Sequence, residues 1–335
     1  MKTTFAIRIA IVGIAVSGLI FACNKNNSND SGNEQTASSL GTQADDQTMI
    51  SDENENVSND INTALVSQVS TNGDSKSASI ISGTTAVNST EQVNGVSTVN
   101  GDLICDATVA FDTASDPRTI TITYNGTNCW GNRTRNGKVV ISMAAGIHWR
   151  DANAVVSVSI QNLNITRLSD GKSITLNGLK TITNTSGGDL KDLANLGSIT
   201  HTISDSLTVT FADSATRTWY ASKTRVFSYN NGIVLTTTGN HSDGTHNGIA
   251  EWGTNRFGVS FIAMILQPMV IRQDCDFRIT GGEYQIIRSD NISSNITFGL
   301  DANGNESACP GSGHYYLEVV WTAPNGRSYP IILPY

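Results

Sequence analysis

Two short polar segments bring together residues that could bind a metal ion. His241, Asp243 and His246 lie within GNHSDGTHNG, and imidazole and carboxylate groups are common metal ligands. The segment is also rich in turn-forming residues, which place such side chains in solvent. The sequence therefore favours a solvated hairpin loop here over a metal site.

A second segment has part of the ligand spacing of a calcium-binding loop. Asp301, Asn303 and Asn305 match the first oxygen ligands of such a loop. However, Glu306 stands where the loop needs glycine, and Ser312 stands where it needs glutamate. A polar turn next to Cys309 explains this segment better, and we expect no metal ion or other cofactor.

Residues for catalysis do not form a recognisable motif. The chain has no Gly-x-Ser-x-Gly segment, which marks many serine hydrolases. Residues 101–335 contain four glutamates and many aspartates near turns, but no two of them can be assigned to facing walls of a cleft, as acid–base hydrolysis needs. We therefore expect a protein that is not an enzyme.

Aromatic residues are a better functional lead. The five tryptophans all follow residue 100, and an exposed indole can stack on a sugar ring, although most tryptophans in sheets belong to the core. Trp130 differs because it lies in the turn-rich segment GTNCWGNRTRNG, close to Arg133 and Arg135. These three are the candidate binding residues, for an anionic glycan or a lipid headgroup. A solvated basic hairpin is the alternative.

Four cysteines in the second part of the chain predict disulfides. No Cys-x-x-Cys segment occurs, so a zinc site is poorly supported, and an even number of cysteines in an exported chain indicates disulfide bonds. The pattern Cys-Asp-x-x-apolar begins at Cys105 and again at Cys275, and an Ile-Thr-aromatic strand and a cysteine follow each time. Of the three pairings that four cysteines allow, this repeat favours Cys105–Cys129 and Cys275–Cys309.

The N-terminus has the features of a lipoprotein signal peptide. Residues 1–22 carry two basic residues and then an apolar run that is too short for a stable membrane span. The residues before Cys23 are similar to a bacterial lipobox, although Phe21 replaces the usual small residue. We predict cleavage before Cys23 and attachment of lipid to it, which would anchor the protein to the outer membrane.

Residues 23–100 read as an acidic, disordered tether. They contain ten acidic and two basic residues and no aromatic residue, so they offer little apolar surface to offset the entropy of ordering. One exception is a short amphipathic helix predicted over 54–69, where Val57, Ile61 and Leu65 fall at helical spacing. Such a helix could dock on the β domain.

Residues 101–335 read as one disulfide-stabilised, all-β domain. Apolar residues alternate with Thr and Ser, and Asn-Gly dipeptides separate the alternating runs. This pattern predicts a large antiparallel meander that must fold into a sandwich or curl. Its 19 acidic and 17 basic residues nearly cancel, which argues against nucleic acid as a partner. Only GGDLKDLANLG, near 187–197, predicts a helical turn.

Several segments of this domain resemble a group of uncharacterised Bacteroidota cell-envelope lipoproteins. They include ITITYNGTNCWGNRTRNGKVVI, LNGLKTITNT, TRTWYASKTRVFSYNNG and QPMVIRQDCDFRITGGEYQI. The loop GLDANGNESAC departs from the tighter loop of that group. The resemblance implies an envelope lipoprotein and no catalytic residues.

The sequence thus predicts a lipid-anchored envelope protein that binds a partner without catalysis. It would sit on the periplasmic face or the outer surface of the outer membrane, and a glycan or an envelope protein is the candidate partner. Two alternatives remain: a surface glycan-binding lipoprotein, and a carrier of a lipid or other hydrophobic ligand on the concave face of a curled sheet.

Overall fold

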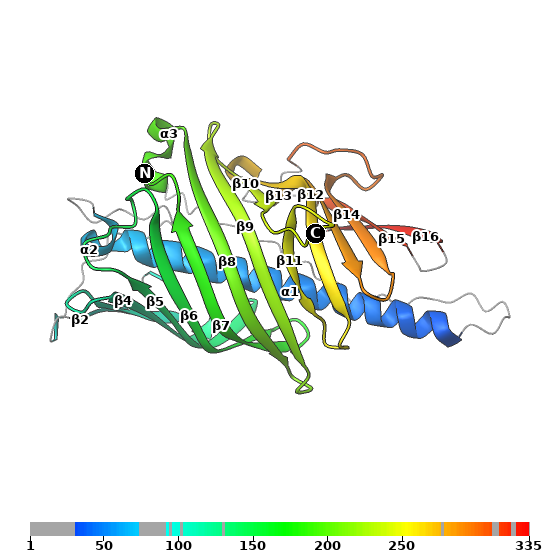
Figure 1. Cartoon of the computed structure of the whole chain (residues 1–335), viewed down its shortest axis with the longest axis horizontal. Helices are drawn as coiled ribbons and strands as arrows, with labels where there is room; N and C mark the ends of the chain where they lie inside the picture. The colour runs from blue at the N-terminus through cyan, green and yellow to red at the C-terminus, as the bar shows by residue number, and fades with distance from the viewer. Residues whose placement is uncertain are drawn as a thin grey trace, which may run out of the picture.

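The computed structural model describes residues 31–73, 92–93, 96–100, 103–128, 131–275, 278–309, 315–322 and 326–334. Within these ranges the chain forms one long helix and an antiparallel sheet that curls around it (Figure 1). The predicted antiparallel meander is therefore confirmed, in the form of a curled sheet.

The described strands belong to a single sixteen-stranded sheet in which neighbours in sequence are mostly neighbours in space. The exception is β11, which pairs with β9 and β12. The strands are β1 (Gln92–Val93), β2 (Val96–Asn100), β3 (Ala107–Asp112), β4 (Arg118–Thr127), β5 (Arg133–Met143), β6 (Ala154–Arg167), β7 (Ser173–Asn184), β8 (Ser198–Phe211), β9 (Thr216–Tyr229), β10 (Ile233–Gly239), β11 (Ile249–Thr254), β12 (Ser260–Arg272), β13 (Arg278–Arg288), β14 (Ser293–Leu300), β15 (Tyr316–Thr322) and β16 (Ser328–Pro334).

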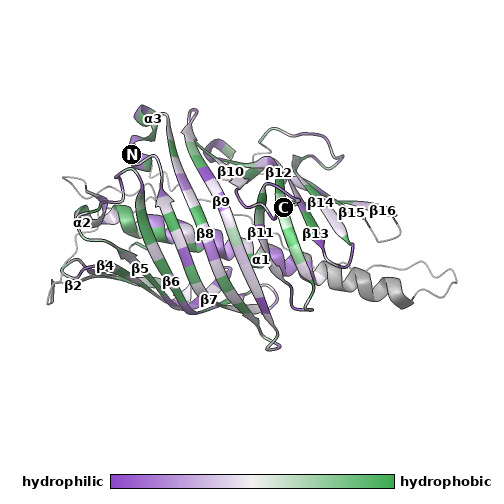
Figure 2. Ribbon diagram, viewed as in Figure 1, coloured by the Kyte–Doolittle hydropathy of each residue, from purple (hydrophilic) through white to green (hydrophobic). Residues whose placement is uncertain are grey.

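Alternation along the strands separates an inner face from an outer face. In β8 every second residue from Ile199 to Phe211 is buried, and the residues between them are more exposed. Figure 2 shows the same alternation of hydrophobic and hydrophilic residues on the neighbouring strands. Because successive side chains of a strand point to opposite faces, the apolar set lines the concave side and the Thr/Ser set lies outside.

The predicted turns are confirmed only in part, because the Asn-Gly dipeptides that begin at Asn125, Asn136 and Asn177 lie inside β4, β5 and β7. Asn231 and Gly232 both have positive φ, 53° and 156°, in the loop between β9 and β10. Short helical segments, η1 (Leu190–Asp192) and α3 (Leu193–Leu196), occupy the predicted helical turn near 187–197. A further one, η2 (Gln273–Cys275), precedes β13.

β-Bulges increase the curvature of the sheet around the long helix. The register of β5 against β6 shifts between Asn136 and Lys138, and Gly137 there has φ of 137°. A Cβ on Gly137 would lie 2.4 Å from the carbonyl oxygen of Asn162, on the adjacent bulge of β6. An inserted residue on one strand increases local twist and curvature, so this close crossing of two backbones is part of how the sheet closes around the helix.

Most of helix α1 (Ser31–Ser67) lies inside this curl, its N-terminal end projects beyond the sheet, and α2 (Val69–Asn72) follows it (Figure 1). Its buried apolar residues recur at helical spacing and are at most 1 % exposed: Met49, Ile50, Val57, Ile61, Ala64 and Leu65. All six belong to the same core cluster as the inner residues of the sheet. Burying a large apolar side chain contributes roughly 1.5–3 kcal/mol, so tertiary packing stabilises a helix whose own composition is mostly polar.

The end of the helical segment is tied to the sheet by hydrogen bonds. The backbone N–H of Trp149 donates to the carbonyl of Thr71 at 2.8 Å, and the Asn72 amide donates to Asp189 at 2.9 Å. Arg118 donates to the carbonyl of Ser70. These bonds fix the position of α1 along the curl.

The structure corrects the predicted domain organisation. The short helix predicted over 54–69 is part of the much longer α1, and the tether prediction is wrong for residues 42–73, which pack inside the sheet. The sheet also begins at Gln92, before the predicted boundary at residue 101. Residues 1–30 and 74–91, which hold the predicted signal peptide, Cys23 and the rest of the tether, lie outside the described residues. No described helix combines the length and hydropathy needed to span a membrane.

Candidate functional site

Many ion pairs join α1 to the inner face of the sheet among the described residues. Helix α1 has no Lys or Arg. Six of its carboxylates form ion pairs with Lys or Arg of the sheet and its loops: Asp45, Asp46, Asp52, Glu53, Glu55 and Asp60. We call the sheet residues that meet them the cationic lining: Arg133, Arg135, Arg167, Lys172, Lys223, Arg225 and Arg256.

Asp45 and Asp46 are the first carboxylates along α1 that pair with the cationic lining. Asp45 receives hydrogen bonds from Arg167, the closer at 2.8 Å. Asp46 lies 2.7 Å from both Lys172 and Arg256. Burial would raise the pKa of Asp45, but its hydrogen bonds to Arg167 and Lys172 outweigh burial and hold the pKa below its usual value. Asp45 therefore remains charged inside the curl.

Arg133 meets the middle of the helix. Its Nε lies 2.7 Å from Glu53, and its Nη2 lies 3.6 Å from Asp52. Burial raises the pKa of Asp52 to about 7, against the attraction of Arg133. Burial likewise raises the pKa of Glu53. Arg133 is only 5 % exposed.

Arg135 binds two carboxylates at once. It donates to Asp106 through two nitrogens, at 2.6 and 2.7 Å, and to Asp60 of α1 at 2.8 Å. Its guanidinium also lies 4.3 Å from the ring centroid of Tyr124, whose hydroxyl donates to Asp60. The candidate binding residues Arg133 and Arg135 are thus corrected from an exposed basic hairpin to buried partners of α1, because the strand alternation turns both side chains inward. Trp130 lies outside the described residues.

Glu251 is the centre of a second buried network. Its carboxylate accepts hydrogen bonds from Lys223 at 2.7 Å, Tyr284 at 2.9 Å and Ser51 of α1 at 3.1 Å. Burial opposes its ionisation, but Lys223 and these hydrogen bonds keep the pKa of Glu251 below its usual value. Its oxygens are bound by protein donors, so the arrangement holds α1 in register and offers no free base.

Lys180 and Asp205 form an ion pair with both side chains 0 % exposed. The Nζ–Oδ1 distance is 2.7 Å, and Asn54 of α1 also donates to Asp205 at 2.9 Å. Burial lowers the pKa of Lys180, since the charged ammonium loses its hydration. Such a pair holds its geometry only while both partners and the helix are present.

A small pocket opens beside the C-terminal half of α1. It has a volume of about 40 Å³ and is lined by Asn59, Asn62 and Leu65 of the helix and by His201, Arg225 and Phe227 of the sheet, with Trp149 beside them. We call it the His201 pocket. At roughly 10–15 Å³ per water it has room for a few small atoms but not for an acyl chain.

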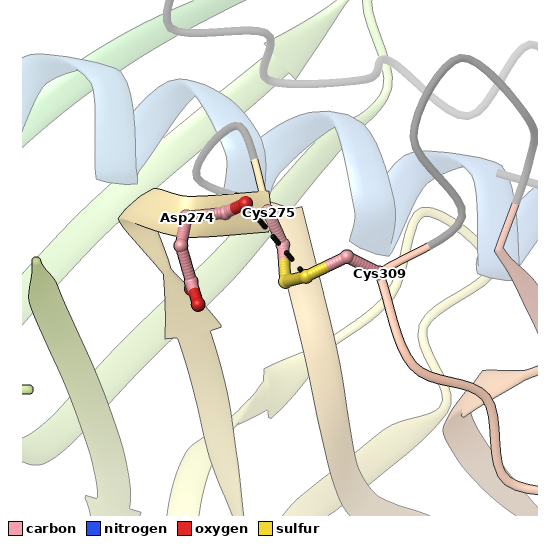
Figure 3. A group of neighbouring side chains, drawn as sticks. All are labelled: Asp274, Cys275 and Cys309. Atoms are coloured by element: carbon pink, nitrogen blue, oxygen red, sulfur yellow. Dashed lines mark hydrogen bonds between the residues drawn. A yellow bond between two sulfur atoms is a disulfide. The ribbon is translucent and has the colours of Figure 1, made fainter. Parts of the chain in front are cut away.

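Of the two predicted disulfide bonds, the structure contains the one between Cys275 and Cys309. Cys275 and Cys309 are bonded, with their Cα atoms 5.2 Å apart. Cys105 is in a disulfide as well, and Cys129 lies outside the described residues, so the Cys105–Cys129 bond stays a prediction. Asp274 lies beside the Cys275–Cys309 sulfurs (Figure 3). Because those sulfurs are bonded to each other, they are not thiolate ligands, and one carboxylate remains.

The two polar loops considered as metal sites are held by turn hydrogen bonds. Asp243 accepts the backbone N–H of His246 at 2.7 Å, and these bonds lower its pKa to about 2. Asp301 accepts the backbone N–H groups of Asn303 and Asn305 at 2.8 and 3.0 Å. Both carboxylates therefore serve as turn acceptors.

The described tryptophans divide between core and outer face. Trp149 and Trp219 are buried, at 2 % and 0 % exposure. Trp252 is half-buried and stacks on Tyr220, with ring centroids 5.7 Å apart, and on His241, at 4.0 Å. Tyr220 and Trp252 are register partners on β9 and β11, where alternation with buried Trp219 directs them outward. This half-buried stack is one ring surface that a sugar could contact, and the edge-to-face pair of Trp321 with Tyr329, which is 48 % exposed, is another.

Sequence reasoning missed the cationic lining itself. Its members are spread from Arg133 to Arg256 and are neighbours only because the sheet curls. A signal was present, since basic residues occupy inward positions of the alternating strands, such as Lys180, which lies two positions before buried Ile182 on β7. The second signal is the acidic excess of α1, whose charge is opposite to theirs. No protein-family model, no curated protein and no solved structure matches this chain.

Proposed function

We propose that the chain is a lipid-anchored, non-catalytic binding protein of the cell envelope, and that the inner face of its sheet is the ligand-binding surface. In this proposal α1 is the resident occupant of that surface. The observation that carries it is the charge match: acidic residues along α1 meet basic residues on the sheet through ion pairs.

Displacement of α1 would leave strong binding groups without partners. Among the described residues, Arg133, Lys172 and Arg225 form ion pairs only with carboxylates of α1. A cation in an apolar surrounding that loses its anion is costly. The surface therefore requires an occupant that supplies negative charge along its length.

The spacing of the cations favours an acidic helical segment of a partner protein. The row of carboxylates runs from Asp45 to Asp60, which is about 22 Å along a helix at 1.5 Å per residue. Apolar residues such as Ile50, Val57 and Ile61 lie among them. A single lipid headgroup would satisfy only a short part of this row, whereas an acidic amphipathic helix satisfies all of it.

The test uses a fluorescent synthetic peptide with the sequence of residues 42–67 and the full-length protein. Glu53→Gln with Asp60→Asn weakens the hold of α1 and should raise peptide affinity about tenfold over wild type, a change of about 1.4 kcal/mol. Glu306→Gln, an exposed change in a distant loop, is the matched control. A peptide with its six acidic residues changed to amides should not bind.

Hydrogen exchange on the same samples shows whether α1 leaves the sheet. Faster exchange of residues 42–67 with bound peptide supports the proposal. Equal binding of the acidic and amide peptides would contradict it, and so would no binding to a variant whose α1 exchanges freely. Anionic lipid vesicles and an acidic polysaccharide are added in separate arms, to find whether either displaces α1 instead.

The outer aromatic stack favours glycan binding as a second candidate function. Tyr220, Trp252 and His241 are half-buried, and hydroxyl residues such as Ser206 and Ser222 surround them on the outer face. Binding to a panel of soluble polysaccharides that Trp252→Ala abolishes, and that Trp321→Ala leaves intact, would support this function.

The anchor is tested separately. A fatty-acid analogue should label the wild-type protein and not Cys23→Ala, and only the wild type should co-sediment with outer membrane. Equal labelling would remove the lipid anchor from the proposal and leave the binding surface unaffected.

A further inference from the structure

The His201 pocket is a place where a buried cation keeps an unused hydrogen-bond donor. Arg225 is 4 % exposed, and its Nη2 pairs with Glu55 of α1. Its Nε has no hydrogen-bond partner among the described residues. A buried donor without an acceptor costs free energy, so a group that accepts this hydrogen bond is favoured.

Further polar groups line the same pocket. Asn59 and Asn62 reach it from α1, and the indole N–H of Trp149 already satisfies the oxygen of Asn62 at 3.1 Å, which leaves the amide N–H groups of Asn62 as donors. His201 lies edge-to-face between Trp149 and Phe227, with ring centroids 5.1 Å apart in both pairs. Burial lowers the pKa of His201 to about 4, so at neutral pH it is an uncharged donor and adds no second positive charge.

We propose that the His201 pocket is a carboxylate-binding subsite, in which the Nε–H of Arg225 and the amides of Asn59 and Asn62 hold the two oxygens. Arg225 provides the charge, and Trp149 and Phe227 form aromatic walls of the pocket. Charge-assisted hydrogen bonds from a guanidinium to a carboxylate are strong and planar.

The size of the pocket selects the ligand. A volume of about 40 Å³ corresponds to roughly three water positions at 10–15 Å³ each, which matches the three heavy atoms of a carboxylate. A phosphate or sulfate group has five heavy atoms and is bulkier than a carboxylate, so a pocket of this size favours the carboxylate. The carboxylate belongs either to a small free acid or to an acidic side chain or C-terminus of a protein.

This subsite deepens the proposed function and rests on it for its biological meaning, because it gives a partner's carboxylate a first contact at the edge of α1. Asn59 is exposed, so the pocket is reached from solvent while the helix is in place. Glu55 stays paired with Nη2 of Arg225 while the carboxylate binds. Binding of a small acid thus needs no displacement of α1 and is measured independently of it.

The experiment titrates full-length protein with sodium acetate at constant ionic strength and follows the tryptophan indole N–H signals by NMR, with Trp149→Phe identifying the signal of Trp149. We expect that signal to shift and saturate in about the millimolar range, as four non-hydrogen atoms allow, while those of Trp252 and Trp321 stay in place. Chloride should cause no saturable shift, and phosphate should bind at least tenfold more weakly.

Two variants and a control decide the assignment. Arg225→Gln should weaken acetate binding at least tenfold. Because that change also breaks a buried ion pair, Asn59→Leu provides a second test, since it fills the pocket from an exposed helix position and should also abolish the shift with an unchanged melting temperature. Arg272→Gln, which removes an exposed guanidinium paired with Asp274, should bind acetate like wild type.

A linear shift without saturation would overturn the proposal, as would tight phosphate binding or full acetate binding by folded Asn59→Leu. The acidic peptide of residues 42–67 distinguishes the two sources of the carboxylate. If it shifts the Trp149 signal and loses this effect in Asn59→Leu, the subsite serves a protein segment; if only acetate does so, the subsite serves a small acid. Loss of peptide-induced release of α1 with acetate binding intact would reject the proposed function alone.

Discussion

Asp60 of α1 and Arg135 of β5 are joined by a hydrogen bond of 2.8 Å between residues 75 positions apart in the chain. The same guanidinium holds Asp106, whose side chain is 0 % exposed. One cation therefore compensates a carboxylate from the helix and one from the segment before β3. This relationship links the position of α1 directly to the stability of the sheet.

Arg135→Met should destabilise the protein by about 3–5 kcal/mol, because it leaves two buried carboxylates without a cation. Urea unfolding followed by circular dichroism measures the loss. Arg272→Met is the matched control: its ion pair with Asp274 is exposed on both sides, so its loss should leave the urea midpoint close to that of wild type. Similar losses in the two variants would mean that the ion pairs of α1 are not buried in solution.

Gly137→Ala should destabilise the protein by about 1–3 kcal/mol. Its φ of 137° is unfavourable for any other residue, and the added Cβ would meet the carbonyl oxygen of Asn162 at 2.4 Å. Gly281→Ala is the control, since that glycine also lies in a strand but has no atom within 4 Å of the added Cβ. The difference in urea midpoint between the two variants measures the contribution of the bulge, and equal midpoints would show that the two backbones do not cross so closely.

The strands and turns could be predicted from the sequence because their signals are local. Period-two alternation gives the two faces, and Asn-Gly gives the turn at Asn231 and Gly232. The same dipeptide lies inside a strand at Asn136 and at Asn177, where the prediction of a turn is wrong. The way the sheet closes could not be predicted. It depends on bulges such as the one opposite Asn162, and a one-residue insertion has no distinct composition.

We predicted disorder for most of the segment that forms α1, because an argument from composition assumes that polar residues are exposed to solvent. Asp46, Glu53 and Asn54 are at most 1 % exposed, and each has polar partners or close polar neighbours on the sheet. The rule that polar, acidic segments stay disordered assumes that nothing in the chain compensates them. Here the compensating cations lie more than 70 positions away, so no local window contains both halves of the interaction.

Lys180→Met should lower the free energy of unfolding by several kcal/mol, since it removes the cation of the buried Asp205 carboxylate and leaves Asn54 as its remaining donor among the described residues. Adding Asp205→Asn removes that charge and should restore part of the loss. The double-mutant cycle therefore has a defined sign, with the double variant more stable than Lys180→Met alone. A double variant that is less stable would show that Asp205 finds another cation when Lys180 is removed.

The free energy of unfolding should depend on pH through Asp52, because the pKa of this carboxyl differs between the folded and unfolded states. Burial raises the pKa of this carboxyl from its ordinary value of 3.8 to about 7. A carboxyl whose folded pKa lies above its unfolded pKa binds protons more tightly in the folded state. Its contribution therefore stabilises the fold as pH falls through 7 toward 4, and it opposes folding above pH 7.

We therefore expect the unfolding free energy of wild type, relative to Asp52→Asn, to rise by up to about 1.4 kcal/mol per pH unit as the pH is lowered between 7 and 4. Asp170→Asn is a control of opposite sign, because the hydrogen bond from Arg167 lowers the pKa of Asp170 to about 2. Its contribution is present above about pH 4 and is lost as pH falls through 2. Urea unfolding at pH 4, 5, 6, 7 and 8 measures the Asp52 difference, and points at pH 2 and 3 measure that of Asp170. If the Asp52 difference instead grew with rising pH, Arg133 would dominate over burial, and this carboxylate would hold α1 as a stabilising ion pair at neutral pH.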